Sequence, residues 1–162
     1  MTVALYDDTP GIVWRPVSPR LASARRIATV VTMAPFLLGA MALAIFVTRW
    51  SWVAVAVLLA LLVLQFVLIG RQVSAISYAE LPEELVIRRG RLFRRLVSIP
   101  YGRLQYADMA SGPLMRRLGI ASVTIHTASP ASGGSLPGLA LAEAEALRDR
   151  LTALGEAQRA GL

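Results

Sequence analysis

Five arginines within eight residues are the side chains of this sequence best suited to chemistry. They are Arg88, Arg89, Arg91, Arg94 and Arg95, and no acidic residue interrupts the stretch. Guanidinium groups bind phosphate oxygens in a bidentate fashion, and each basic residue close to an anionic lipid surface contributes about 1 kcal/mol of attraction. The alternative is a solvated strand face with no ligand, and the sequence leaves both interpretations open.

The arginine bias extends over the whole chain, which has 17 basic residues and no lysine. A GC-rich genome is the simpler explanation for it, because such a bias affects exposed and functional positions alike. The position of the charge is more informative. Residues 71–117 hold nine arginines against four acidic residues, a net charge of +5, whereas residues 118–162 hold three arginines against four acidic residues.

Two further arginines are candidates for contact with a partner. Arg103 follows the break expected at Pro100, and Arg116 lies in a short helical segment over residues 113–118. Both are therefore expected near the ends of strands, where a partner has access. A packing role, or an ion pair with Asp108, is the alternative for each.

Catalytic and metal-binding residues are not expected. His126 is the single histidine, and on the polar face of a strand it is more typical of an exposed or hydrogen-bonded residue than of a catalyst. The chain has no cysteine and no group of His, Asp and Glu at metal-ligand spacing. Gly133-Gly134 lacks the lysine of a phosphate-binding loop. We therefore expect no enzyme, no metal and no cofactor.

Two long apolar runs precede the arginine cluster and indicate that it is attached to a membrane. Residues 27–48 and 52–70 contain no charged residue, and only three residues separate them. At 1.5 Å of rise per residue they give helices of about 33 and 28 Å, close to the roughly 30 Å core of a bilayer. A signal peptide cleaved near residues 42–44 is disfavoured, because the first run is too long and a second span follows. The pattern predicts an antiparallel transmembrane hairpin.

The flanking charges predict the orientation of this hairpin. Four arginines precede the first run and Arg71 follows the second, whereas the short link holds only Arg49. The positive-inside rule therefore places both termini in the cytoplasm of a multi-pass protein of the cell membrane. Neither run contains an ionisable residue, so a transport path is not expected.

Small residues in the hairpin give it faces for close helix packing. They are Ala40 and Ala44 in the first run and Ala56 and Ala60 in the second. Such faces pack either on each other or on another membrane protein.

From residue 73 onward, short apolar runs broken by turn residues predict a β-rich domain. Strands are expected over residues 75–79, 85–88, 92–99, 104–109 and 121–127, with a short one around Leu136. Gly90 is expected in a tight turn between the second and third of these strands. A closing helix over residues 140–154 carries an apolar stripe made of Ala140, Ala144, Leu147, Leu151 and Leu154.

These patterns divide the chain into four segments. We expect a cytoplasmic juxtamembrane segment over residues 1–26, a transmembrane hairpin over 27–70, a cytoplasmic domain over 71–156 and a frayed tail over 157–162.

Four short motifs follow the hairpin in a regular order. They are Leu85-Val86-Ile87-Arg88-Arg89-Gly90, Ile99-Pro100-Tyr101-Gly102-Arg103-Leu104-Gln105, Gly112-Pro113-Leu114-Met115-Arg116-Arg117-Leu118-Gly119 and Val123-Thr124-Ile125-His126-Thr127. With the hairpin and the lead over residues 14–20, they resemble the bacterial pleckstrin-homology-like (PH-like) membrane proteins of the YdbS/YdbT type over about residues 73–155. The resemblance implies an α+β fold, with a strongly bent antiparallel sheet or barrel capped by a C-terminal helix, and no enzyme activity.

Together these observations predict a membrane-anchored, non-catalytic binding module. Its cytoplasmic PH-like domain is expected to dock a protein partner or the anionic membrane surface, through the five clustered arginines, Arg103 and Arg116. The alternative is a structural or assembly subunit of a larger membrane complex, in envelope stress or export, that acts through the hairpin; a homo-oligomer is compatible with either. Nucleic acid is not an expected partner, because aromatic residues for base stacking are not interleaved with the basic ones.

Overall fold

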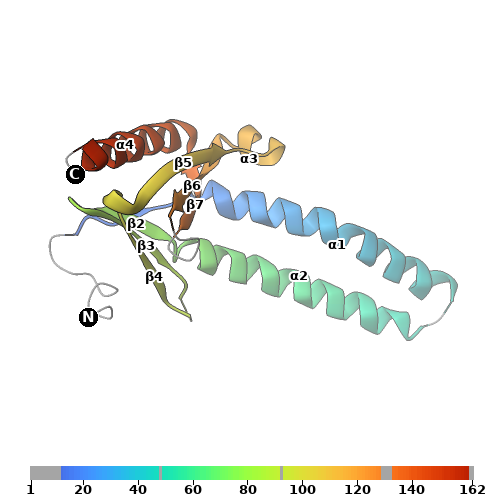
Figure 1. Ribbon diagram of the computed structural model, residues 1–162. Helices are drawn as coiled ribbons and strands as arrows, with labels where there is room; N and C mark the ends of the chain where they lie inside the picture. Colours follow the sequence, from blue (N-terminus) through green and yellow to red (C-terminus); the bar gives the residue numbers. More distant parts are fainter. Residues whose placement is uncertain (1–11, 48, 92, 129–132, 161–162) are drawn as a thin grey trace. The chain divides into compact units, whose positions relative to one another are not determined.

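The computed structural model describes residues 12–47, 49–91, 93–128 and 133–160. It divides into two units (Figure 1). One unit is the helical hairpin Ala22–Arg71. The other combines Met1–Leu21 with Gln72–Leu162, so the chain leaves it and returns to it.

Both predicted transmembrane runs are helical. Helix α1 spans Arg20–Phe46 and helix α2 spans Ser51–Val73, with mean hydropathies of 2.1 and 2.9 in their most apolar stretches. Only 11% of each of those stretches is buried, which leaves most of the apolar side chains exposed, as lipid-facing helices require. These are the membrane-spanning segments of the protein.

Helix α1 begins seven residues earlier than the apolar run predicted. Ser18 caps it, because its Oγ accepts a hydrogen bond from the Arg20 backbone N–H at 3.3 Å, and Pro19 suits the first turn. Three of the four arginines that precede the apolar run, Arg20, Arg25 and Arg26, are therefore helical, whereas Arg15 lies before the helix.

Within the hairpin unit, Arg26 joins the two helices. Its Nη2 donates to the Phe66 carbonyl at 3.3 Å, and its guanidinium carbon lies 5.7 Å from the centre of the Phe66 ring. The small residues predicted to pack within the hairpin are only partly buried there. Ala44 is buried, but Ala56 and Ala60 are exposed, so the face predicted on the second helix is not used inside the hairpin.

The other unit contains two antiparallel sheets. The first has the order β1 (Arg15–Pro16), β2 (Ser77–Glu80), β3 (Glu84–Arg89) and β4 (Arg95–Pro100). The second has the order β5 (Leu104–Ala110), β6 (Ile120–Thr127) and β7 (Gly134–Ala140). The predicted α+β class is confirmed. The strands make a bent sheet arrangement, and no closed barrel forms among the described residues.

Three helical segments complete this unit. They are the 3₁₀ turn η1 (Tyr101–Arg103), the short helix α3 (Pro113–Arg117) and the closing helix α4 (Leu141–Ala160). In Figure 1 α4 lies along β5, and the two elements are in contact.

Strand β1 is the element that the sequence did not reveal. Residues 15 and 16, expected to be part of a juxtamembrane segment, pair with β2 in the register Arg15↔Tyr78 and Pro16↔Ser77. The whole hairpin is therefore inserted between two neighbouring strands of one sheet. This unit therefore uses chain from both sides of the hairpin to complete its first sheet.

The apolar core follows the predicted periodicity in most places. On β6 the alternating residues Val123 and Ile125 are buried, and the residues between them are half-buried. On α4, Ala144, Leu147 and Leu151 are fully buried, as predicted. Two residues of the predicted stripe are not buried with the others. Ala140 is the last residue of β7 and is exposed, and Leu154 is 37% exposed.

Tyr78 connects β2 to α4 and makes the stability of this unit sensitive to high pH. Its side chain is buried, and its hydroxyl donates to Glu143 Oε1 at 2.7 Å. Burial, followed by the hydrogen bond to Glu143, raises the pKa of Tyr78 from 10.0 to about 12. The folded state thus holds this proton more tightly than the unfolded chain does, so its contribution to stability is intact below about pH 10 and is lost as the pH rises towards about 12.

We expect the stability of the wild-type protein to fall more steeply over that pH range than the stability of Tyr78→Phe, measured by thermal unfolding in detergent. The chain has no lysine to titrate in the same range, and Tyr101, whose pKa is also raised by burial, is present in both proteins. Parallel pH profiles for the two proteins would contradict the assignment.

Candidate functional site

The arginine-rich turn between β3 and β4, residues 88–95, is the candidate site. β3 ends at Arg89 and β4 begins at Arg95, so the connecting turn is longer than the tight turn that the sequence predicted. Gly90 has a φ of 84°, and a Cβ at this position would overlap the carbonyl oxygen of Phe93. Only glycine fits this conformation, as predicted, and it directs the chain out of the sheet.

Positive charge is concentrated at this turn. Arg89 and Arg95 are directly opposite each other in the register of β3 and β4. Like charges at directly opposed positions destabilise a strand pair. Arg91, Arg94 and Arg95 are exposed, and Phe93 between them is 89% exposed. The turn therefore presents one large apolar side chain together with exposed arginines.

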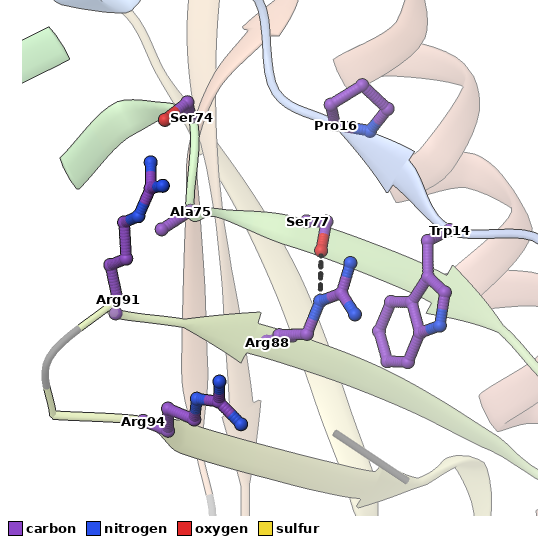
Figure 2. Close-up of a pocket in the computed structure, with 9 residues that line it drawn as sticks. Trp14, Pro16, Ser74, Ala75, Ser77, Arg88, Arg91 and Arg94 are labelled. Carbon is purple, nitrogen blue, oxygen red and sulfur yellow. Dashed lines mark hydrogen bonds between the residues drawn. The ribbon is translucent and has the colours of Figure 1, made fainter. Parts of the chain in front are cut away.

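A cavity of about 310 Å³ lies beside the turn (Figure 2). Its walls come from the lead to β1, from the segment between α2 and β2, from β3 and from the turn itself. The lining residues are Trp14, Pro16, Ser74, Ala75, Ser77, Arg88, Gly90, Arg91 and Arg94. None of these lining residues is acidic, so the described walls of the cavity carry positive charge only.

Contacts with Ser77 and with Trp14 hold Arg88 at the wall of this cavity. Its Nε donates to Ser77 Oγ at 2.9 Å, across the β2–β3 pair, as the dashed line in Figure 2 shows. Its guanidinium carbon lies 4.4 Å from the centre of the Trp14 ring, a cation–π distance. Arg88 is therefore oriented before any ligand arrives.

The predicted site residues fall into one group and two outliers. Arg88, Arg91 and Arg94 line the cavity, while Arg89 and Arg95 lie opposite each other at the ends of β3 and β4 and do not line it. Arg103, at the end of η1, and Arg116, on α3, are both exposed and do not line this cavity.

The ion pair considered between these outliers and Asp108 is replaced by another contact. Asp108 Oδ2 lies 3.2 Å from His126 Nε2, and the His126 ring stacks on Tyr106 with 4.4 Å between ring centres. Arg116 instead directs its Nη2 to the Ser111 carbonyl, at the 3.5 Å limit of a hydrogen bond. His126 is thus a partly exposed, partnered strand residue, as predicted.

Sequence reasoning missed the residues that complete the cavity. Trp14, Ser74 and Ser77 are separated from the arginine cluster by the hairpin or by a strand, and their types alone indicate no site. The pairing of β1 with β2 brings Trp14 to Arg88, and no local pattern in the sequence predicts that pairing. The lead over residues 14–20, which contributes to the family resemblance, was the feature of the sequence that could have drawn attention to Trp14.

The chemistry available here is binding of anions. Among the residues that the structure describes, no group of three or more His, Cys, Asp and Glu could hold a metal ion. Guanidinium and hydroxyl groups, by contrast, are donors for phosphate or carboxylate oxygens.

The chain was compared with known proteins. The sequence model of the bacterial PH domain family matches residues 24–154. Among curated proteins, the UPF0699 transmembrane protein YdbS of Bacillus subtilis (strain 168) is 37% identical over 71 residues, which make up 44% of this chain and 43% of YdbS. The chain thus matches less than half of the length of that relative. No solved structure matches it.

Proposed function

Since this chain belongs to the bacterial PH domain family, we propose that it is a membrane-anchored, non-catalytic binding module whose PH-like domain docks on anionic lipid. The hairpin fixes the protein in the bilayer, and the turn over residues 88–95 contacts the lipid headgroups on the same side. By the positive-inside rule that side is the cytoplasmic face of the cell membrane.

The observation that carries this proposal is the exposed Phe93 in the same turn as the exposed Arg91, Arg94 and Arg95. Aromatic side chains favour the boundary between headgroups and acyl chains, and basic residues near an anionic leaflet are attracted to it. A protein partner would also contact exposed arginines. An isolated, 89% exposed phenylalanine at the tip of a basic turn fits insertion into a lipid surface better.

Strand register supports the same conclusion. Pro16, Ser77 and Arg88 lie side by side at one end of the first sheet. Only residues 74–76 separate Ser77 from the last residue of α2, and an extended link of that length spans at most about 14 Å. In chain order, the arginine-rich end of the sheet is therefore the end from which β1 leads on towards α1 and at which β2 begins after α2.

The test uses the full-length protein in lipid nanodiscs. Because the chain has no cysteine, Phe93→Cys provides a single attachment point for a fluorophore that reports the polarity of its surroundings. We expect blue-shifted emission in discs rich in phosphatidylglycerol but not in discs of phosphatidylcholine. The shift should decrease in about 1 M salt, where the Debye length is roughly 3 Å.

The control places the same fluorophore at Ala153→Cys, an exposed position on α4. Its emission should not depend on the lipid. Adding Arg95→Gln to the Phe93→Cys protein should reduce the shift. Identical emission from position 93 in both lipids would contradict docking.

A further inference from the structure

We propose that the cavity lined by Trp14, Ser77 and Arg88 is a binding site for a phosphate monoester group. The inference deepens the docking proposed above, and rests on it, because it names the headgroup chemistry that the docked turn selects. Phosphate monoesters occur both on lipid headgroups and on soluble metabolites, and the experiment below separates these two sources.

The charge of the cavity fits a doubly charged anion. Three arginines, Arg88, Arg91 and Arg94, line it, and no acidic residue is among the described lining residues. A phosphate monoester carries a charge of about −1.5 to −2 at neutral pH. The phosphodiester of an ordinary phospholipid carries only one negative charge. A site with three guanidinium groups therefore favours the monoester.

The donors around the cavity are suited to phosphate oxygens. The hydroxyl groups of Ser74 and Ser77 lie on its walls together with the guanidinium groups. In Figure 2 Arg91 points from the turn towards Ser74 and Ala75, and Arg88 lies between Ser77 and Trp14. Its volume of about 310 Å³ is at the lower end of the range for small-molecule sites, which suits a headgroup rather than an extended ligand.

The site is also partly preorganised. The hydrogen bond to Ser77 and the contact with Trp14 hold the Arg88 guanidinium, so less side-chain entropy is lost when a ligand binds. Trp14 is at the same time a reporter in the wall of the cavity. The other two tryptophans of the chain, Trp50 and Trp52, lie in the hairpin and can be replaced with phenylalanine.

The experiment measures Trp14 emission of full-length Trp50→Phe/Trp52→Phe protein in phosphatidylcholine nanodiscs. One arm adds phosphatidic acid to the discs, a second adds phosphatidylglycerol, and a third adds glycerol 3-phosphate to the solution. We expect a saturable change in Trp14 emission with a phosphate monoester. The affinity for phosphatidylglycerol should be lower than the affinity for the monoester by a factor of about ten or more. Saturation by phosphatidic acid alone identifies a lipid headgroup, and saturation also by glycerol 3-phosphate shows that the soluble phosphate suffices.

Variants test the assignment of the site. Arg88→Gln is expected to weaken the monoester response about tenfold, and Arg91→Gln/Arg94→Gln, which alters only exposed turn residues, guards against misfolding of the first variant. Arg103→Gln, an exposed arginine outside the cavity, is the matched control and should bind as the parent does.

Equal responses to phosphatidic acid and phosphatidylglycerol would overturn the inference, as would equal losses in Arg88→Gln and Arg103→Gln. If Trp14 shows no response while the fluorophore at position 93 still reports docking, the monoester site is refuted and the docking stands.

Discussion

Gly90→Ala is expected to abolish docking of the arginine-rich turn and to destabilise the PH-like domain. Alanine at a φ of 84° is strained by about 1–2 kcal/mol. Its Cβ would also overlap the Phe93 carbonyl oxygen, so the turn must change shape. The altered turn would no longer present Phe93 between the arginines or close the wall of the cavity.

Hydrogen exchange of the β3–β4 peptides and the fluorophore assay at position 93 measure these two effects. Gly112→Ala is the matched control, because a Cβ there meets no other atom within 4 Å and its φ is −68°. Wild-type docking by Gly90→Ala would mean that the conformation of this turn is not required.

Leu151→Ala is expected to cost the PH-like domain about 2–5 kcal/mol, the usual cost of truncating a fully buried leucine. Leu151 is buried on the face of α4 that packs on β5 and η1. Because small domains have only about 5–15 kcal/mol of stability, this loss is a large fraction of the total. Peptides of α4 and β5 should lose protection from hydrogen exchange, while the membrane-spanning helices keep theirs.

The control lies one turn further along the same helix. Leu154 belongs to the same predicted stripe but is 37% exposed, so Leu154→Ala should cost less than about 1 kcal/mol. Similar losses of protection in the two variants would show that α4 does not bury its stripe as described.

Local patterns predicted most of the fold. Apolar runs of sufficient length indicated the hairpin, the alternation around Val123 and Ile125 indicated β6, and the helical spacing of Leu147 and Leu151 indicated α4. These patterns depend on neighbours in the sequence. The predicted family resemblance was confirmed by the match of the family model.

Long-range pairing could not be predicted. Two residues, Arg15 and Pro16, are too few to show an alternation, and their partner strand follows them only after the entire hairpin. The contact of Trp14 with Arg88 depends on that pairing, so the cavity could not be inferred although its arginines could. The start of α1 was also missed. Its first turns, which follow the cap at Ser18, contain arginines, so they lack the continuous apolar character by which the transmembrane run was recognised.

Docking on lipid is tested by a photo-crosslinking residue at position 93 of the full-length protein in native membranes. Docking predicts lipid adducts at this position, identified by mass spectrometry, and few at positions 103 and 116, which lie away from the arginine-rich turn. A single protein captured from position 93, with no lipid adduct, would contradict docking on lipid and would identify the turn as a protein-binding surface.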